Sequence, residues 1–397
     1  MPKYHICIAG KNQIAVDALL YLISKGWGER LMVCPNKNDT GNSNWQPSLA
    51  RFAGEFSIPI VTLEEAQKIN NLVFISLEFD RIIRPAQFAS QRLYNIHFSE
   101  LPAYKGMYTS ALPLLHGCER SGVTLHEIDP GIDTGNIVAQ KKFDINNNWN
   151  CRELYFAYMS HGFTLFCGNF DKLVANHPVA SIPQPSIGST YFSKNSINYR
   201  DIVIDTKDTA FGIVRQLKAF SFREYQVPKI EGMSVGAWSI LPSKSSEYPG
   251  TILEKSDNNC ILSTIDYDLK VLRFTDWDWF NLVDFNTRDC DPSSINILDK
   301  MGWSPLIRAV YKGDISLCKL LLRCGADPNV TNLNGTTPLM YSFACNNRSA
   351  AEKTSQLLIA HGAKINEQDK FNKALRDYDP AAFHFAESCL NSINNNS

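Results

Sequence analysis

The sequence predicts an α/β domain with a doubly wound, mostly parallel sheet, then a small mostly β domain, then an α-helical repeat domain. Three observations predict this order. Strand-like and helix-like patterns alternate up to about residue 145, a Pro-, Ser- and Gly-rich stretch spans residues 176–190, and a motif recurs in the C-terminal part. The expected boundaries are 1–188, 189–285 and 286–397, because 397 residues exceed one ordinary hydrophobic core.

Short apolar runs predict the strands of the first domain, and apolar residues at helical spacing predict its helices. The expected strands are 4–9, 31–34, 58–61, 71–77, 93–97, 122–128 and an extended ribbon at 137–143; the expected helices are 15–24, 48–56, 109–116 and 151–175. The turn after the first strand, Gly10-Lys11-Asn12-Gln13, lacks the glycines of a dinucleotide-binding loop. We therefore expect a nucleotide-type sheet without that cofactor.

The stretch 176–190 contains three prolines and a glycine, which indicates a linker. Beyond this stretch, the pattern changes to one helix followed by short strands. A helix at 209–220 and strands at 234–241, 250–254, 260–264 and 269–274 are separated by turn-forming residues. This pattern predicts the small mostly β domain.

The C-terminal repeat is read directly from two matching motifs. Asp299-Lys-Met-Gly-Trp-Ser-Pro-Leu306 matches Asn332-Leu-Asn-Gly-Thr-Thr-Pro-Leu339 at an offset of 33 residues, and each is followed by helical sequence and a Gly-Ala turn. These segments resemble ankyrin repeats, in which Ser-Pro or Thr-Pro opens the first helix and glycine ends the second. The second repeat is four residues longer, and the excess is expected between its helices near 346–353. Residues 369–375 resemble a degenerate third repeat that acts as a cap.

Composition excludes several classes of protein. A net charge of −1 provides no general attraction for nucleic acid or an anionic membrane. The eleven cysteines are scattered without a CxxC pair, so free thiols in a reducing cytoplasm are expected rather than disulfides or a metal site. The N-terminus is unlike a signal peptide, and no apolar stretch approaches the roughly 20 residues of a membrane span. We expect a cytoplasmic protein.

Three polar residues are candidates for catalysis. Asn95 and His97 alternate at the end of a predicted strand, so they point to the same side at the sheet edge where α/β proteins bind ligands. Asp133 lies in a Gly-rich loop that can fold over that edge. Transfer of an acyl group to an amine needs a donor to the oxyanion, a proton carrier and a carboxylate that orients the carrier. Taken singly, a histidine after a strand or an aspartate in such a loop is more often structural.

Four motifs in order resemble the folate-dependent formyltransferase family: Asn95-Ile-His97, Leu101-Pro-Ala-Tyr-Lys-Gly106, Gly122-Val-Thr-Leu-His126 and Asp129-Pro-Gly-Ile-Asp-Thr-Gly135. The resemblance covers about residues 1–275. It implies the formyltransferase fold, N10-formyltetrahydrofolate as cosubstrate, no metal, and Asn95, His97 and Asp133 as the catalytic trio. It also implies a pterin pocket with candidate residues Ser76, Glu78, Phe79, Asp80, His126, Asp129 and Ile132, although His126 has an equally good structural interpretation.

The family contains several classes that differ in the amine they formylate. The purine-synthesis member binds phosphate on a Gly-rich first loop, the initiator-tRNA member needs a basic surface, and the hydrolase carries an N-terminal regulatory domain; this sequence matches none of these well. It is similar to the members that formylate nucleotide-linked amino sugars, in its compact second domain and in the segments 191–205 and 215–232. Two alternatives stay open, namely formylation of initiator tRNA or a purine precursor, and an ankyrin scaffold with an inactive enzyme core.

The resemblance to sugar formyltransferases implies a set of substrate contacts. Arginines can pair with a diphosphate and aromatic rings can stack on a base, while other residues reach the sugar. The candidates are Asn12, Tyr104, Lys105, Arg200, Phe222, Arg223 and Tyr225. The expected acceptor is an amino-dideoxysugar on a nucleoside diphosphate, with thymidine as the expected base, whose product would suit O-antigen and lipopolysaccharide synthesis. We expect a homodimer with no nucleic-acid or membrane partner.

The ankyrin repeats admit three interpretations. Such repeats usually grip a protein, although this array is short for a standard interface of about 800 Å² per partner. A small ligand such as the nucleotide sugar could instead contact Trp303, Arg308, Tyr311 and Tyr341. In the third interpretation, Trp303 only packs on the next repeat.

Overall fold

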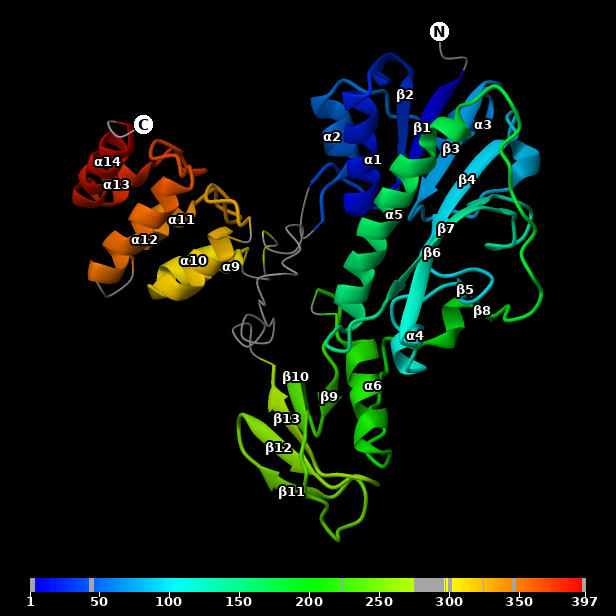
Figure 1. Cartoon of the computed structure of the whole chain (residues 1–397). Helices are drawn as coiled ribbons and strands as arrows, with labels where there is room; N and C mark the ends of the chain where they lie inside the picture. Colours follow the sequence, from blue (N-terminus) through cyan, green and yellow to red (C-terminus); the bar gives the residue numbers. More distant parts are fainter. Residues whose placement is uncertain are drawn as a thin grey trace. The chain divides into compact units, whose positions relative to one another are not determined.

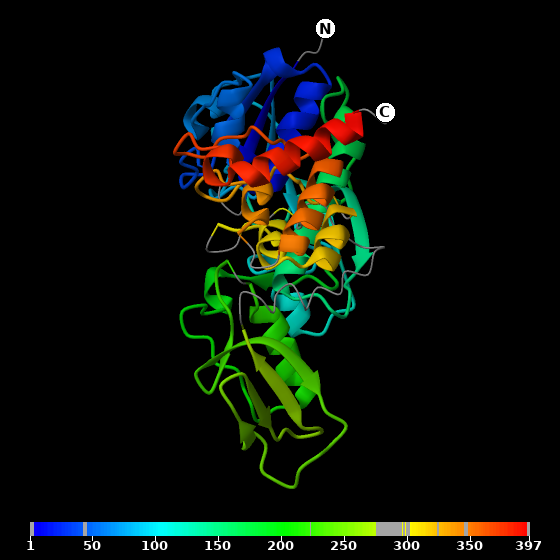
Figure 2. The ribbon, with the colours of Figure 1, turned by 90° about the vertical axis from the view of Figure 1, so that its left-hand side faces the viewer.

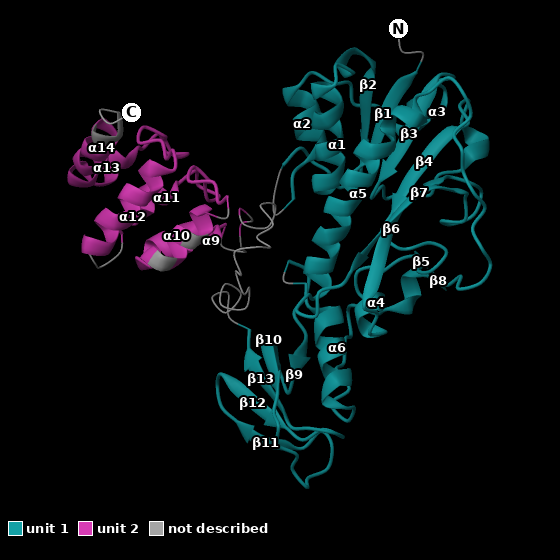
Figure 3. Cartoon of the chain, viewed as in Figure 1, with its two compact units in different colours: residues 1–274 teal, residues 275–397 magenta. Residues whose placement is uncertain are grey.

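The computed structural model describes residues 4–42, 46–222, 224–274, 302–323, 325–344 and 348–394, together with residues 296 and 298. The chain divides into two compact units, Met1–Phe274 and Thr275–Ser397 (Figure 3). Residues 275–285, which were expected in the second domain, lie outside the described residues. In the described part of the chain, no helix is both long and apolar enough to cross a membrane.

A six-stranded sheet forms the centre of the first unit, in the order β2-β1-β3-β4-β6-β7 (Figure 1). Its strands are β1 (His5–Gly10), β2 (Leu31–Pro35), β3 (Leu72–Leu77), β4 (Arg92–His97), β6 (Arg120–Glu127) and β7 (Ile137–Asp144). The first four pair in parallel, whereas β6 and β7 are antiparallel to their neighbours. The predicted mostly parallel α/β sheet is confirmed. The carboxyl ends of β1, β2, β3 and β4 meet at one edge.

Helices cover both faces of this sheet. α1 (Asn12–Ser24) and α5 (Cys151–Leu173) pack together on one face, where Gly162 of α5 lies against Ile14 of α1 and Ile96 of β4. The short α3 (Leu63–Gln67) contributes to a core that includes Leu93, whose position in β4 is on the opposite face from Ile96. α2 (Leu49–Glu55) contacts α1 and β2, and α4 (Leu112–Leu115) precedes β6.

Two expectations for these elements are wrong. Residues 58–61 form no strand, only an isolated bridge to β2, because Pro59 has no N–H for a ladder. The helix expected over 109–116 is confined to the four residues of α4. The helix α3 was not expected, because it is too short to show a helical period; a capping box between Thr62 and Glu65 marks its start.

A second sheet completes the first unit, in the order β11-β12-β13-β10-β9 (Figure 1 and Figure 2). Its strands are β9 (Lys229–Ile230), β10 (Met233–Ile240), β11 (Ile252–Lys255), β12 (Asn259–Leu262) and β13 (Leu269–Arg273). The helix α6 (Ala210–Phe220) begins at the cap residue Thr209 and packs Ile213 and Leu217 against this sheet. The predicted β-rich region is confirmed, and α6 also contacts α4 and α5.

The segment interpreted as a linker is not free. Ile182 exchanges two backbone hydrogen bonds with Ile137 of β7, at 2.8 and 2.9 Å. Farther along, β8 (Tyr191–Phe192) pairs in parallel with β5 (Lys105–Gly106). Proline, serine and glycine correctly indicated that most of this stretch lacks regular secondary structure, but such composition does not exclude tertiary hydrogen bonds. A strand of two residues leaves no periodicity to read.

The described residues of the second unit form three helix pairs. They are α9 (Pro305–Lys312) with α10 (Ile315–Arg323), α11 (Pro338–Ser342) with α12 (Arg348–Ala360), and α13 (Leu375–Tyr378) with α14 (Pro380–Asn394). Ser304 and Thr337 cap the first helices of two pairs, and proline follows each cap, as ankyrin repeats predict. The extra residues of the second repeat lie partly between its helices, as expected: five residues (343–347) separate α11 from α12, against two (313–314) between α9 and α10, and α12 has 13 residues against 9 in α10.

Gly10, at the end of β1, allows the close approach of β1 and β3 to be tested. Gly10 has a φ of 155°, and a Cβ atom there would lie 1.8 Å from the carbonyl oxygen of Leu77. We predict that Gly10→Ala lowers the free energy of unfolding by about 1–3 kcal/mol, because strands β1 and β3 must separate. Gly28→Ala, where nothing lies within 4 Å, is the control. Urea unfolding curves that coincide for both variants would contradict the close packing of β1 on β3.

Candidate active site

The carboxylate of Asp133 lies among three polar side chains at the end of β4. Its Oδ2 is 3.4 Å from Nδ1 of His97, and its Oδ1 is 3.3 Å from Nδ2 of Asn95 and 3.5 Å from Nε2 of His126. Asn95 and His97 share one side of β4, and His126 is the partner of Asn95 in the neighbouring strand β6. The structure therefore brings together the three expected catalytic residues and one expected pterin residue.

The two histidines are held in defined tautomers by main-chain carbonyl groups. Nε2 of His97 lies 2.8 Å from the carbonyl oxygen of Tyr104, which can only accept, so the ring donates from Nε2. When this ring is neutral, its unprotonated Nδ1 faces Asp133. Nδ1 of His126 donates to the carbonyl oxygen of Glu127 at 2.7 Å, so its neutral Nε2 accepts from Asn95 at 3.1 Å.

Burial and charge set the protonation states of this pair. Burial lowers the pKa of His97, and the carboxylate of Asp133 opposes that shift only in part. Burial alone would raise the pKa of Asp133, but His97, His126 and the N–H of Gly106, 2.9 Å away, together hold it well below its usual range. At neutral pH the site therefore holds a neutral imidazole beside a carboxylate. A neutral imidazole can accept a proton from an attacking amine.

Asn95 already uses its amide hydrogens inside the site. One points to His126 and the other to Asp133. The contact with Asp133, at 3.3 Å, is longer than the usual N–H···O distance of about 2.9 Å. An incoming carbonyl oxygen can therefore take this hydrogen at low cost. This exchange is what a donor to a developing oxyanion requires.

Backbone strain is concentrated among the candidate residues. Four of them have the positive φ that side chains other than glycine rarely adopt: Asn12 (63°), Glu78 (59°), Tyr104 (57°) and Asp133 (54°). Such conformations persist where surrounding contacts over-determine them, and they are common at functional sites.

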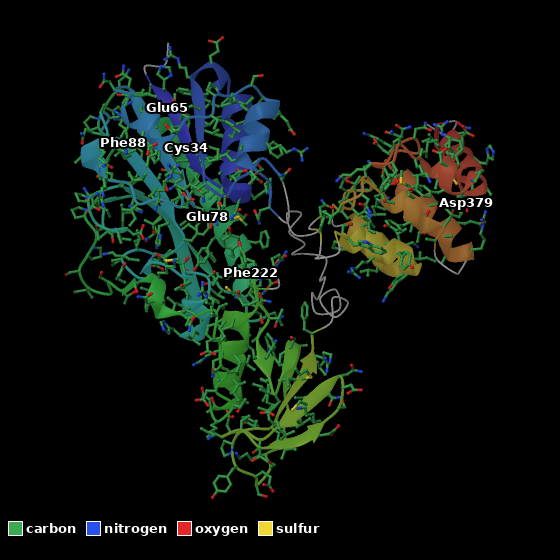
Figure 4. The ribbon with its side chains drawn as sticks, turned by 180° about the vertical axis from the view of Figure 1, so that it is seen from behind. Cys34, Glu65, Glu78, Phe88, Phe222 and Asp379 are labelled. Carbon is green, nitrogen blue, oxygen red and sulfur yellow. The ribbon has the colours of Figure 1, made fainter. Side chains whose placement is uncertain are left out.

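A second polar cluster joins Glu78, expected at the folate, to Asn12, expected at the sugar. Oε2 of Glu78 accepts hydrogen bonds from Nδ2 of Asn12 at 3.0 Å and from the hydroxyl of Tyr155 at 2.5 Å. Burial raises the pKa of Glu78. Phe222 packs on Tyr155, with ring centroids 5.6 Å apart. Figure 4 labels Glu78 and Phe222 of this cluster. No sequence pattern pointed to Tyr155, because only the packing of α5 brings it here.

The remaining expected pterin residues mostly support loops. Asp129 accepts hydrogen bonds from Gly131 and Thr134 in its own loop, and Asp80 accepts from the N–H of Lys37. Phe79 packs between Phe74 and the guanidinium of Arg81, Ser76 is buried in β3, and Ile132 is 40 % exposed. The loop at 78–80 follows β3 at the carboxyl edge of the parallel strands, whereas the segment 126–133 follows the antiparallel β6 and folds back to bring Asp133 to Asn95 and His97. The carboxylates of both segments already have partners.

The expected substrate residues are distributed over several places. Tyr104 stacks on Phe192 and bonds through its hydroxyl to His116, while Lys105 donates to Ser189. Phe222 contacts Tyr225 at 4.8 Å between ring centroids. Arg200 is exposed, and Arg223 lies outside the described residues.

The turn that carries Phe222 and Tyr225 is anchored by an ion pair that the sequence did not reveal. Nε of Arg152 on α5 lies 3.0 and 2.9 Å from the two carboxylate oxygens of Glu224, and both side chains are buried. Within the described residues, no group of three or more His, Cys, Asp or Glu side chains is arranged to hold a metal.

In the ankyrin unit, the four residues expected at a ligand site lie together. The Trp303 ring is 4.7 Å from Tyr341 and 5.1 Å from Tyr311, between centroids, and the guanidinium of Arg308 lies 5.6 Å from the Trp303 ring. Tyr311 keeps 45 % of its surface exposed.

Comparison with known proteins identifies both parts of the chain. The family model for formyl transferase matches residues 61–162, and the model for ankyrin repeats (three copies) matches residues 280–369. The crystal structure of WlaRD, a sugar 3N-formyltransferase studied with dTDP and 5-N-formyltetrahydrofolate, is 41 % identical, with a TM-score of 0.64; the match covers 69 % of this chain and 98 % of that one. The N-formyltransferase from Helicobacter canadensis, in complex with folinic acid and dTDP-3-aminofucose, is 40 % identical, with a TM-score of 0.64 and coverage of 68 % and 100 %.

Curated relatives are more distant. The methionyl-tRNA formyltransferase of Fervidobacterium nodosum is 27 % identical over 253 residues, which is 61 % of this chain and 76 % of that protein. That of Clostridioides difficile is 26 % identical, over 61 % of this chain and 77 % of that protein.

The arrangement of the site predicts how His97 titrates. The carboxylate of Asp133 favours the charged imidazole, so its removal in Asp133→Asn should lower the pKa of His97 further below the ordinary value. NMR titration of 15N-labelled histidine measures this directly and needs no substrate. Asp129→Asn, a carboxylate in the same loop, should leave the titration of His97 unchanged. A pKa of His97 that stays constant or rises in Asp133→Asn would contradict the assigned pairing.

Proposed function

The chain belongs to the formyltransferase family, and we propose that it transfers a formyl group from N10-formyltetrahydrofolate to the amine of a dTDP-linked amino-dideoxysugar. The observation that carries this proposal is the pairing of Asp133 with His97 and Asn95 at the carboxyl edge of the sheet. Solved sugar formyltransferases at 40 and 41 % identity, studied with dTDP or a dTDP-sugar and formylated folates, support the choice of substrates. The product would serve synthesis of a cell-surface polysaccharide such as an O-antigen.

Each member of the trio then has one role. As the sugar amine bonds to the formyl carbon, Nδ1 of His97 accepts the proton that the amine loses. Asp133, 3.4 Å from that nitrogen, stabilises the positive charge that forms on the ring. Asn95 donates an N–H to the formyl oxygen as negative charge develops there. The bond to N10 breaks, and tetrahydrofolate leaves after N10 takes up a proton.

The folate is proposed to lie along the loops 78–80 and 126–133. The loop 78–80 follows β3 beside β4, and the segment 126–133 folds back from the end of the antiparallel β6 to Asp133, where the neighbouring Ile132 presents an exposed apolar side chain. N10-formyltetrahydrofolate supplies the formyl group and a stable amine leaving group.

The alternative acceptor, methionyl-tRNA, is supported by the names of the curated relatives but less well by this chain. Identity to those relatives is 26–27 %, against 40–41 % to the sugar enzymes, which the chain also covers almost completely. A net charge of −1 provides little attraction for a polyanion such as tRNA.

The role of the trio predicts a loss of turnover in three variants. We expect Asn95→Ala, His97→Asn and Asp133→Asn each to lower kcat by about 100-fold or more while the fold is kept. Mass spectrometry of dTDP-3-aminofucose incubated with N10-formyltetrahydrofolate measures the product, and circular dichroism checks the fold. His177→Asn, an exposed histidine outside the site, is the matched control. Turnover near that of the wild type in all three variants would overturn the proposal.

We extend the proposal to the ankyrin unit, where Trp303, Tyr311, Tyr341 and Arg308 are proposed to hold a second molecule of the nucleotide sugar. The adjoining rings and the guanidinium offer stacking and phosphate pairing. Calorimetry of the full chain with dTDP-3-aminofucose should then show two sites, and one in Trp303→Ala. A single site in both proteins would reject this extension and leave a protein partner, or packing between repeats, as the role of the cluster.

A further inference from the structure

Residues 182–192, here called the strap, cross from the edge of the large sheet to β5. At one end, Ile182 is bonded to Ile137 of β7, and at the other, β8 pairs with β5. The strap passes the catalytic trio on the way. Its contacts with the loop of Asp133 and with the loop of Tyr104 are polar and specific, although its composition resembles that of a free linker.

Gln184 of the strap holds the loop of Asp133. Its Nε2 donates one hydrogen to the carbonyl oxygen of Asp133 and one to that of Gly135, both at 2.8 Å. These bonds fasten a backbone in which Asp133 has a φ of 54°. The following turn is equally confined, since a Cβ atom at Gly135 would lie 1.8 Å from the carbonyl oxygen of Glu127.

Thr190 of the strap holds the loop that orients His97. Its Oγ1 accepts the N–H of Tyr104 at 2.7 Å, and its own N–H donates to the carbonyl oxygen of Pro102 at 3.2 Å. The carbonyl group of the same Tyr104 is the acceptor that fixes the tautomer of His97.

The strap also reaches the carboxylate of Asp133 through β5. Gly106 donates its N–H to Oδ2 of Asp133 at 2.9 Å, and it is paired with Phe192 of the strap. A Cβ atom at Gly106 would lie 2.2 Å from the carbonyl oxygen of Phe192, so only glycine allows this approach. Both members of the His97–Asp133 pair therefore receive their orientation from the same eleven-residue segment.

We propose that Gln184 and Thr190 are positioning residues of the formyl transfer, acting through the backbone of Asp133 and Tyr104. The expected fall in kcat rests on the proposed function, whereas the expected loosening of the two loops does not. If the strap sets the angle between His97 and Asp133, loosening it slows the chemical step more than it weakens substrate binding.

Gln184→Glu tests the first contact with almost no change in shape. An ionised glutamate would place an acceptor opposite two carbonyl oxygens, so both hydrogen bonds are lost. We expect kcat to fall by about 10- to 100-fold with little change in KM for either substrate. A protonated glutamate can donate one hydrogen, so the ratio of wild-type to variant kcat should shrink as the pH is lowered. Gln91→Glu, which adds the same charge at an exposed position before β4, is the matched control.

Thr190→Val tests the second contact, because it removes Oγ1 and keeps the β-branched shape and the backbone pairing. It should also lower kcat, and Ser186→Ala, an exposed hydroxyl of the same strap, should not.

Hydrogen–deuterium exchange provides a readout that needs no substrate. We expect faster exchange in residues 129–135 for Gln184→Glu and in residues 101–107 for Thr190→Val, with no change in the controls. If both variants exchange faster but the wild type transfers no formyl group, the proposed function is rejected, while the role of Gln184 and Thr190 in holding the two loops is kept. Unchanged exchange with unchanged kcat, or a rise in KM alone, would overturn the positioning role itself.

Discussion

The arrangement of the first unit depends on one buried carboxylate. Removing Asp133 from water disfavours its ionised form, so the fold must supply compensating donors and positive charge. The donors come from separate parts of the chain: the amide of Asn95 at the end of β4 and the N–H of Gly106 on β5. The rings of His97 and His126, 3.4 and 3.5 Å away, add positive charge when they are protonated. Because β6 runs antiparallel beside β4, His126 is brought opposite Asn95. An ionised carboxylate beside a neutral imidazole is the electrostatic condition for taking a proton from an attacking amine.

The position of the Asp133 carboxylate depends on two loops whose backbone conformations are unfavourable without supporting contacts. Asp133 and Tyr104 both have positive φ, and the strap fastens both loops through Gln184 and Thr190. A comparable arrangement surrounds the second buried carboxylate, Glu78, which accepts hydrogen bonds from Tyr155 of α5 and Asn12 of α1. The site is therefore stiff because several elements meet at it, and each contributes one or two hydrogen bonds.

The fold and the catalytic trio could be predicted from the sequence, whereas contacts between residues far apart in the sequence could not. Alternation in a strand placed Asn95 and His97 on one side, and the Gly-rich loop pointed to Asp133. The strap was misinterpreted as a linker, because composition reports local conformation and not partners. Gln184 and Asp133 are 51 residues apart, and Tyr155 and Glu78 are 77 apart, so only tertiary packing brings these pairs together. In the ankyrin unit the repeat was confirmed, and its extra residues both lengthen α12 and widen the interval between α11 and α12.

The central claim is that this buried pair formylates a small nucleotide-linked amine and not a macromolecule. A chain of net charge −1 has little to attract tRNA, whereas its similarity to sugar formyltransferases extends over nearly their whole length. The most direct measurement is a competition: the full chain is given N10-formyltetrahydrofolate together with dTDP-3-aminofucose and initiator methionyl-tRNA, and both products are followed by mass spectrometry. The account predicts that formylated sugar accumulates while the tRNA stays at the level of the enzyme-free control. Formylation of the tRNA in preference to the sugar would contradict it.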